Sequence, residues 1–205
     1  MKSEKRALNA LDRLYSSGYN RLRNHNLKND IKIEGFFISD CGILFIRNID
    51  HNLIIGFSSL LDTIKQIYHD MMEKDFMLMT SIAYGQFKYQ SRIEFTGIEK
   101  NRVYGNAYLS AYLDTERNKY KIQPGQCRIV RENLPQNLID AIEQRVPKDP
   151  FSMIKTRRGD SQHFYFYWMV NESSQIDHFE ENYQDTYNLK YTGMLQALKN
   201  ARNNG

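Results

Sequence analysis

The sequence has few of the residues that build disulfide scaffolds and metal clusters. Only two of its 205 residues are cysteine, Cys41 and Cys127, and neither lies in a CxxC pair. This usage is typical of a reduced cytoplasmic protein and excludes a disulfide-rich secreted domain. No apolar run is long enough to span a bilayer, and the opening MKSEKRALNALDRL lacks the apolar core of a signal peptide. We therefore expect a cytoplasmic protein with no membrane partner.

Several catalytic signatures are also missing. The sequence contains no GxSxG, Walker or HExxH pattern, and its five histidines have no metal-ligand spacing. The net charge is only +4, and the densest basic group is Lys155, Arg157 and Arg158. A duplex-binding protein usually carries a denser basic stripe, so the composition argues against nucleic acid as a partner. This weak positive charge is compatible with a pocket for a small polyanion. It is equally compatible with the absence of any anionic ligand.

Aromatic residues are abundant, with fourteen Tyr and eleven Phe. Such side chains usually pack in cores, but they also stack on nucleobases. A surface that binds single-stranded nucleic acid is therefore one possible function of the chain. Hydrophobic residues make up 41% of the sequence and charged residues 25%. These fractions are ordinary for a globular protein with one sizeable core.

Hydrophobic periodicity predicts alternating helices and strands. Helices are expected at 3–24, 57–74, 103–114, 133–144 and 176–202. Strands are expected within 31–48 as a hairpin, within 76–90 with a return at 92–97, and at 127–130 and 163–170. The order predicts an α/β (α+β) fold in which one mixed sheet is covered by helices mainly on one face.

Asp40 is the first candidate for chemistry. It interrupts the apolar segment FFISDCGILF, where a carboxylate is costly unless it is paired or binds a metal. An acidic residue at a strand end can hold magnesium together with the phosphates of a nucleotide. A hairpin turn that uses Asp for local hydrogen bonds explains the same residue, so both interpretations stay open.

Two glycine motifs follow Asp40 along the chain. In SIAYGQF, Gly85 permits close approach of a ligand or a neighbouring strand, or it marks a simple bulge. In GNAYLSAYLDTE, Gly105 opens a helix whose free N–H groups could bind an anion, or the helix simply begins there.

The hairpin with Asp40, the helix after it, and the two glycine motifs together resemble the catalytic domain of class III nucleotide cyclases. The resemblance is closest to the pyrimidine cyclases of the bacterial antiphage system called Pycsar. It covers roughly residues 5 to 130 and rests on Ile82 to Gly85 and on the spacing from Gly105 to Glu116. It divides the chain into a cyclase-like palm over 1–130 and a strand-helix extension of the same domain over 131–205.

The resemblance implies a ferredoxin-like palm sheet and a head-to-tail homodimer with sites at its interface. It implies conversion of UTP or CTP to a 3′,5′-cyclic monophosphate, an antiviral second messenger, with release of pyrophosphate. Two ions of Mg²⁺ or Mn²⁺ would assist, with Asp40 as a metal ligand. The implied substrate-binding residues are Ser39, Tyr84, Gly85, Lys88, Asn106, Tyr108 and Tyr112.

The sequence departs from this family at two places. The family begins with a central strand that carries a second metal-binding Asp, and no such strand precedes the first helix here; Asp12, the nearest carboxylate, lies in a helical pattern. Purine cyclases place an Asn and an Arg where this chain has Leu109 and Leu113. The true start could lie upstream, another segment could fill the gap, or the chain could be a degenerate cyclase that acts as a nucleotide sensor or interaction module.

Overall fold

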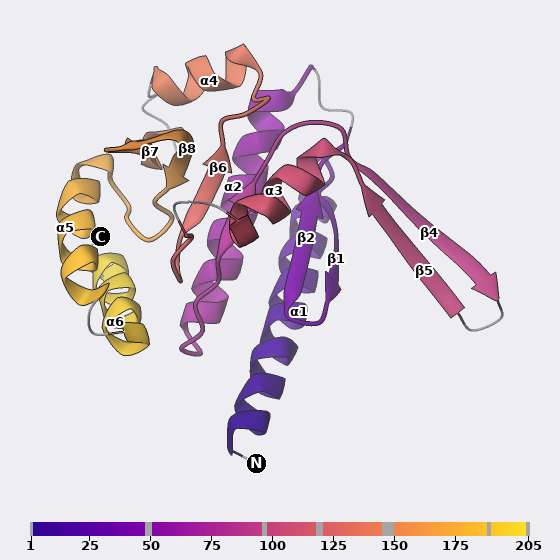
Figure 1. Ribbon diagram of the computed structural model, residues 1–205, viewed down its shortest axis with the longest axis horizontal. Coiled ribbons are helices and arrows are strands. Elements are labelled where there is room, and N and C mark those ends of the chain that lie inside the picture. Colours follow the sequence, from indigo (N-terminus) through magenta and orange to yellow (C-terminus); the bar gives the residue numbers. More distant parts are fainter. Residues whose placement is uncertain are drawn as a thin grey trace.

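The computed structural model describes residues 2–47, 51–95, 98–117, 121–144, 150–187 and 190–203. It shows a mixed α/β protein with a mixed four-stranded sheet (Figure 1). The helices are α1 (Lys2–Lys28), α2 (Leu53–Met72), α3 (Asn106–Arg117), α4 (Gln136–Glu143), α5 (Ile176–Tyr187) and α6 (Lys190–Asn203). The strands are β1 (Glu34–Ile38), β2 (Cys41–Phe45), β3 (Thr80–Ile82), β4 (Lys88–Phe95), β5 (Ile98–Tyr104), β6 (Cys127–Val130), β7 (Ile154–Arg157) and β8 (Asp160–Phe166). The class predicted from the sequence is confirmed at this level.

The prediction of one continuous sheet is wrong for the described residues. The strands form three separate sheets, namely the β1-β2 hairpin, a four-stranded sheet in the order β3-β6-β8-β7, and the β4-β5 hairpin. Strand β3 pairs in parallel with β6, whereas the other pairs are antiparallel. No described strand lies between β2 and β3, so the hairpin and the larger sheet do not join.

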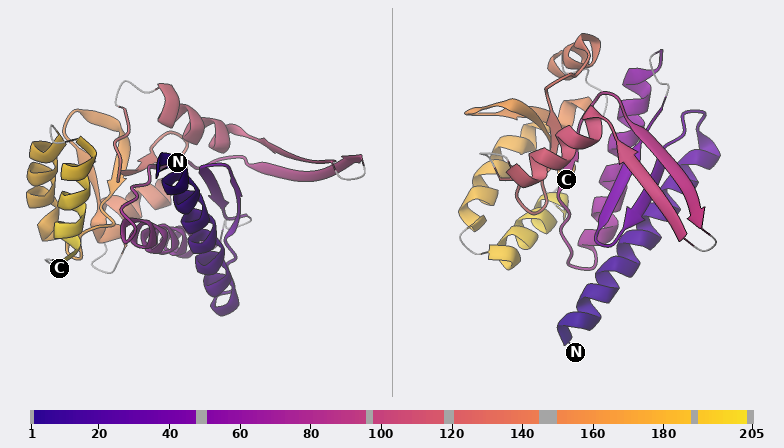
Figure 2. Two further views of the ribbon diagram at one scale, coloured as in Figure 1. Left: turned by 90° about the horizontal axis from the view of Figure 1, so that it is seen from below. Right: turned by 45° about the vertical axis from the view of Figure 1, so that its right-hand side comes forward.

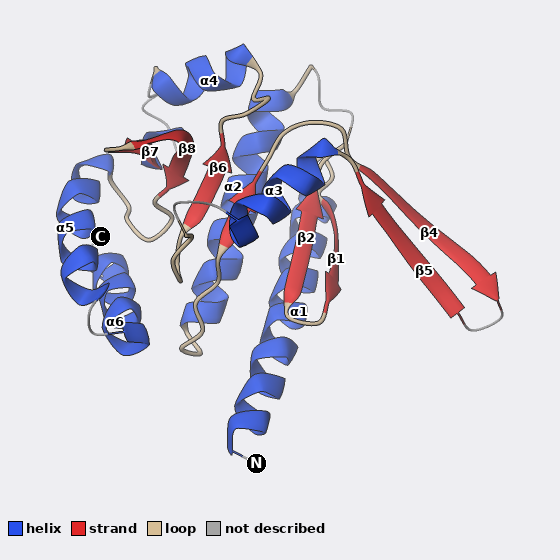
Figure 3. Ribbon diagram, viewed as in Figure 1, coloured by secondary structure: helices blue, strands red, loops and turns tan. Residues whose placement is uncertain are grey.

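Several boundaries also differ from the sequence prediction. The segment from Val103 to Tyr104, expected at the start of a helix, pairs with Lys88 and Tyr89, so β4 and β5 form a long arm that projects from the body (Figure 3). The basic segment around Lys155, for which no helix or strand was expected, is strand β7, because it pairs with β8. The tail forms two helices, and Gly193 lies inside the second of them.

Helices α1 and α2 pack together through a charged contact and an apolar one. Arg21 and Ser17 both hydrogen bond to the Asp70 carboxylate, at 2.6 Å from Arg21 Nη2 and 2.5 Å from Ser17 Oγ. The hydrogen bond from Arg21 holds the pKa of Asp70 below its usual value. Leu14 packs beside Ile67 and Met71 in a small cluster. These contacts fix α1 along the outer side of α2.

Gly18 permits the close approach of α1 to the β1-β2 hairpin. A Cβ atom at this position would lie 1.9 Å from Cζ of Phe37, whose ring also contacts Tyr15. We expect Gly18→Ala to lower the free energy of unfolding by about 1 kcal/mol, because overpacking outweighs the gain of about 1 kcal/mol in helix propensity.

Urea denaturation measures this effect, with Ser16→Ala on the exposed face of α1 as the matched control. The control is expected to gain a few tenths of a kcal/mol. A stabilised Gly18→Ala variant would show that Phe37 does not pack against α1 in solution.

The C-terminal half supplies three of the four strands of the larger sheet, and its helices pack against them. Trp168 donates a hydrogen bond to the Gly125 carbonyl at 2.7 Å, and its ring lies 4.6 Å from that of Tyr68. Tyr183 of α5 donates to the Pro124 carbonyl at 2.6 Å. These contacts join the C-terminal segments to the turn just before β6, so residues beyond 130 contribute directly to the same core.

Candidate functional site

A cavity of about 740 Å³ separates the β1-β2 hairpin from β3. All of β2 and all of β3 line it. The apolar face of α2 and the small residues Ala107 and Ala111 of α3 complete its walls. Figure 2 shows α2 and α3 on opposite sides of the strands, so helices cover the cavity from both sides.

The structure brings most of the predicted site residues to this cavity. Its lining includes Asp40, Tyr84, Gly85, Tyr108 and Tyr112. Of the remaining three, Ser39 shares the β1-β2 turn with Asp40, Asn106 contacts Gly85, and Lys88 begins β4.

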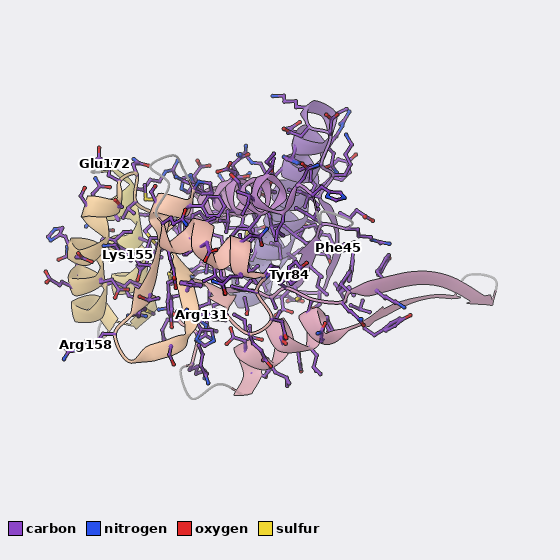
Figure 4. All side chains as sticks on the ribbon, turned by 90° about the horizontal axis from the view of Figure 1, so that it is seen from above. Phe45, Tyr84, Arg131, Lys155, Arg158 and Glu172 are labelled. Carbon is purple, nitrogen blue, oxygen red and sulfur yellow. The ribbon has the colours of Figure 1, made fainter. Side chains whose placement is uncertain are left out.

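These residues nevertheless fall into two groups at opposite ends of the cavity. Phe45, the last residue of β2, lies 4.4 Å from Phe87 at the base of the arm, measured between ring centroids. Asp40 precedes the other end of β2, and five strand residues extend roughly 17 Å. Figure 4 shows Phe45 and Tyr84 on the side from which the arm emerges. Within one chain, Asp40 therefore does not lie beside the arm base, where α3 begins.

The first group consists of the exposed turn between β1 and β2. Ile38 pairs with Cys41, so the turn is Ser39 and Asp40, as a hairpin with Asp40 at its tip predicts. Ser39 has φ 54°, a conformation that favours glycine at the first central position of such turns. The strained serine holds Asp40 at the tip, where it is exposed.

Replacing the strained residue should stabilise the protein. We expect Ser39→Gly to raise the free energy of unfolding by about 1 kcal/mol, because a side chain in the left-handed region costs roughly that much. Thermal unfolding measures the change, and Ser174→Gly, at an exposed serine without positive φ, is the control expected to lose stability. An unchanged or lower midpoint for Ser39→Gly contradicts the turn geometry.

The second group lies at the arm base, where two glycines meet the start of α3. Gly85 has φ 145°, and a Cβ atom there would lie 2.5 Å from Oδ1 of Asn106. Gly105 faces the Gln86 carbonyl, which accepts a hydrogen bond from the Ala107 amide at 3.2 Å. One N–H at the start of α3 is therefore already used, which reduces the anion-binding capacity predicted for this helix end.

Helix α3 presents a pair of tyrosines beside the arm base. The rings of Tyr108 and Tyr112 are stacked, with centroids 6.2 Å apart and an interplanar angle of 22°. Tyr112 is 50% exposed and Leu109 is 53% exposed. An exposed aromatic pair of this kind can stack on a nucleobase or pack against a protein partner.

The residues around Asp40 do not form a complete metal site. Among the described residues, no group of three His, Cys, Asp or Glu side chains could hold a metal ion. Asp40 offers one carboxylate, and its neighbour Cys41 is an exposed thiol whose pKa is raised by partial burial and by the Asp40 charge. These residues alone do not fit a pair of divalent ions.

A buried charged network that no sequence motif had indicated positions α3. Arg128 of β6 and His163 of β8 are almost fully buried, and both bond to Asp114 near the end of α3. The Arg128 Nη2 and His163 Nε2 atoms lie 2.9 Å and 2.8 Å from Oδ1 of Asp114. Ser81 of β3 donates to the same carboxylate at 2.7 Å. The available signal was Arg128 within the short apolar strand CRIV, since a buried cation needs a partner.

The network continues from His163 to the start of β8. His163 Nδ1 lies 2.8 Å from the Asp160 carboxylate, to which Tyr165 also donates at 2.7 Å. Burial alone would lower the pKa of His163, but its bonds to Asp114 and Asp160 outweigh burial and raise it. Burial and the Asp160 carboxylate raise the pKa of Tyr165 to about 12. When His163 is protonated, the carboxylates of Asp114 and Asp160 are balanced by the cations of Arg128 and His163, and the network has no net charge.

The network predicts a pH dependence of folding. A raised pKa of His163 means that its stabilising contribution is complete below about pH 6.5, the unfolded value, and is lost as the pH rises through the folded value. Asp160, whose pKa is lowered, contributes above about pH 4 and loses its contribution in acid. We expect the urea concentration at the unfolding midpoint to decrease as the pH rises from about 6.5 through the raised folded pKa of His163.

The His163→Gln variant tests the source of this dependence. It should flatten the profile over that pH range, whereas His178→Gln, at an exposed histidine, should not. An equal fall in the midpoint for His163→Gln and the unaltered protein would exclude His163 as its origin.

None of the described helices is long and apolar enough to cross a membrane. The basic group noted in the sequence is not part of the cavity lining, and Figure 4 shows Lys155 and Arg158 on the side of the molecule away from Phe45. Lys155 and Arg157 pair with Asp177 and Glu180 of α5. Comparison with protein-family models, curated proteins and solved structures finds no match for this chain.

Proposed function

We propose that the chain is a nucleotide cyclase that converts UTP or CTP to its 3′,5′-cyclic monophosphate and pyrophosphate, as a signal in antiviral defence. In this reaction the ribose 3′-oxygen bonds to the α-phosphorus, the bond to the β-phosphate oxygen breaks, and the 3′-hydroxyl proton is released. The observation that carries the proposal is the pair of exposed groups at the two ends of one cavity, Asp40 and the α3 tyrosines, which two copies of the chain would bring together, combined with the resemblance of their motifs.

The proposal includes a head-to-tail homodimer. Asp40 lies about 17 Å from the arm base, so a nucleotide held at the tyrosines of one protomer would meet the turn of another. Exposed Tyr104, Leu109 and Tyr112 around the start of α3 supply apolar surface for such an interface. Each dimer would then contain two shared sites, related by its symmetry.

The proposal also includes a ferredoxin-like palm. Its support is the β2-α2-β3 unit, in which one helix connects two strands that run in the same direction. Strand β3 is parallel to β6, and Figure 1 shows the arrows of β2 and β6 pointing the same way. Binding of Mg²⁺ or Mn²⁺ stays a prediction, and Asp40 would contribute one ligand to such an ion.

Incubation with each nucleoside triphosphate in Mg²⁺ or Mn²⁺ tests the activity. UTP or CTP should yield a cyclic product and an equal amount of pyrophosphate. Because Asp40 is exposed, Asp40→Asn should keep the free energy of unfolding within about 0.5 kcal/mol while abolishing turnover. Asp12→Asn, at an exposed carboxylate of α1, is the control that should retain turnover. Folded protein that forms no cyclic product from any nucleotide contradicts the proposal.

A second candidate is a nucleotide sensor or interaction module without turnover. The exposed Leu109 and Tyr112 on one face of α3 favour it, because a partner protein could cover them. It predicts binding of UTP or CTP, or of a partner, that is weakened by Tyr112→Ala while no product forms.

A further inference from the structure

The cavity is bordered by two strand edges that lack neighbours. Among the described residues, β2 pairs only with β1 and β3 pairs only with β6. An unpaired edge presents a row of backbone N–H and C=O groups to its surroundings. Here both edges face the same cavity, and the directions of β2 and β3 agree.

The pairing registers identify the free backbone groups. Ile38 and Cys41 flank a two-residue turn and so form a hydrogen-bonded pair, after which bonded and non-bonded pairs alternate. The N–H and C=O groups of Gly42 and Leu44 therefore point away from β1. In β3 the Thr80 amide bonds to the Gln126 carbonyl on the β6 side, so the backbone of Ser81 points to the opposite side.

The volume of the cavity matches one strand. At sheet spacings a strand residue occupies roughly 160 Å³, the product of its rise, the distance between strands and the distance between layers. A cavity of about 740 Å³ accordingly holds about five residues, and β2 has five. An added strand would extend the β1-β2 ladder on one side and the β3-β6 ladder on the other.

The residues that line the cavity determine which kind of segment could bind there. Helix α2 contributes apolar side chains such as Phe57, Leu60 and Ile64, and α3 contributes Ala107 and Ala111 on the opposite side. Among the described residues of the lining, the charged ones are Asp40 and Arg47, which lie just beyond the two ends of β2. A strand covered on both faces is an uninterrupted apolar run, and its charges would lie only at its ends.

We propose that this cavity binds one extended, uncharged apolar segment of another polypeptide chain, which adds as a strand between β2 and β3. The segment has about five residues rich in Val and Ile. Its backbone bonds to Gly42 and Leu44 on one edge and to Ser81 on the other. The proposal concerns backbone edges and goes beyond nucleotide chemistry, so its test involves no nucleotide.

The probe is a synthetic peptide of five alternating Val and Ile residues, flanked on each side by Thr and Lys. Hydrogen exchange followed by NMR should show exchange slowed about tenfold or more at the amides of Gly42, Leu44 and Ser81. The control peptide has Pro at its centre, which removes a strand donor, and should give no such protection.

A fused form of the probe raises its effective concentration. The peptide is joined before Lys2 through fifteen Gly and Ser residues, with a root-mean-square span of roughly 20 Å. That span suits the distance along α1 to Leu14, which lines the cavity about 18 Å from the start of the helix. The fusion should raise the thermal midpoint above that of the same fusion with the Pro peptide.

A cavity-blocking variant locates the effect. Ala111→Trp should remove the protection, whereas Ser110→Trp, on the same helix but outside the lining, should keep it. Protection that is absent with both the free and the fused peptide overturns the proposal, as does equal protection by the Pro peptide. Protection that appears without peptide and grows with protein concentration also overturns it, since a second copy of the chain would then occupy the cavity.

Discussion

Replacing Arg128 with Met is expected to lower the free energy of unfolding by about 3–5 kcal/mol. Arg128 is 0% exposed and makes bonds to both the carboxylate and the carbonyl of Asp114. The variant removes the cation but leaves Asp114 and Asp160 buried with only His163 to balance them. An unbalanced buried charge costs far more than an exposed pair contributes.

A matched control separates this effect from the loss of any arginine. Arg47 pairs with Glu34 at 3.0 Å, but both side chains are more than 40% exposed. Arg47→Met is expected to cost about 1 kcal/mol or less. Urea denaturation of both variants measures the difference, and a loss below about 1 kcal/mol for Arg128→Met contradicts the buried network.

The double variant Arg128→Met, Asp114→Asn tests the coupling between the two residues. Removing both charges should cost less than the sum of the single losses, because neither partner is then left as a lone buried ion. Strict additivity would mean that the two side chains do not interact in solution. Since Asp114 lies near the end of α3, the same variants should also disturb the placement of Tyr108 and Tyr112.

Local sequence patterns predicted the elements that depend on neighbouring residues. The turn at Ser39 and Asp40 follows from two β-rich runs separated by polar residues, and the structure confirms that hairpin. The apolar face from Leu60 to Met71 predicted α2 to within a few residues at each end. Both signals are short in range, so periodicity alone reveals them.

Contacts between distant residues explain what the sequence did not predict. The arm forms because β4 finds its partner in β5, and Val103 and Tyr104 pair as strand although their composition also suits a helix. The network of Asp114, Arg128 and His163 joins residues up to 49 positions apart. Likewise, the separation of Asp40 from the α3 tyrosines depends on the direction of β2, which no motif in the sequence specifies.

The proposed cyclase with a site shared between two chains predicts a second large effect, which is the activity of mixed dimers. Asp40→Asn and Tyr112→Ala should each reduce cyclase activity about a hundredfold or more, because each removes one half of every shared site. In a dimer with one copy of each variant, one site carries both changes and the other carries neither. Random mixing at equal proportions makes about half of the dimers mixed, and each mixed dimer has one intact site of two. About a quarter of the unaltered activity should therefore return.

The controls in this experiment exclude trivial rescue. Tyr19 of α1 is 62% exposed and lies outside the cavity lining. Tyr19→Ala removes an exposed tyrosine away from the proposed site, so this control variant should keep full activity. A chain that carries both Asp40→Asn and Tyr112→Ala should stay inactive when it is mixed with either single variant in the same proportions, since no dimer of those chains contains an intact site.

The rate of product formation after mixing Asp40→Asn with Tyr112→Ala tests the shared site most directly. We predict about a quarter of the activity of the unaltered dimer at equal proportions, and a decline as either variant is made the excess component. Activity that stays at the level of the separate variants, in a sample that sedimentation shows to contain dimers, would contradict the shared site.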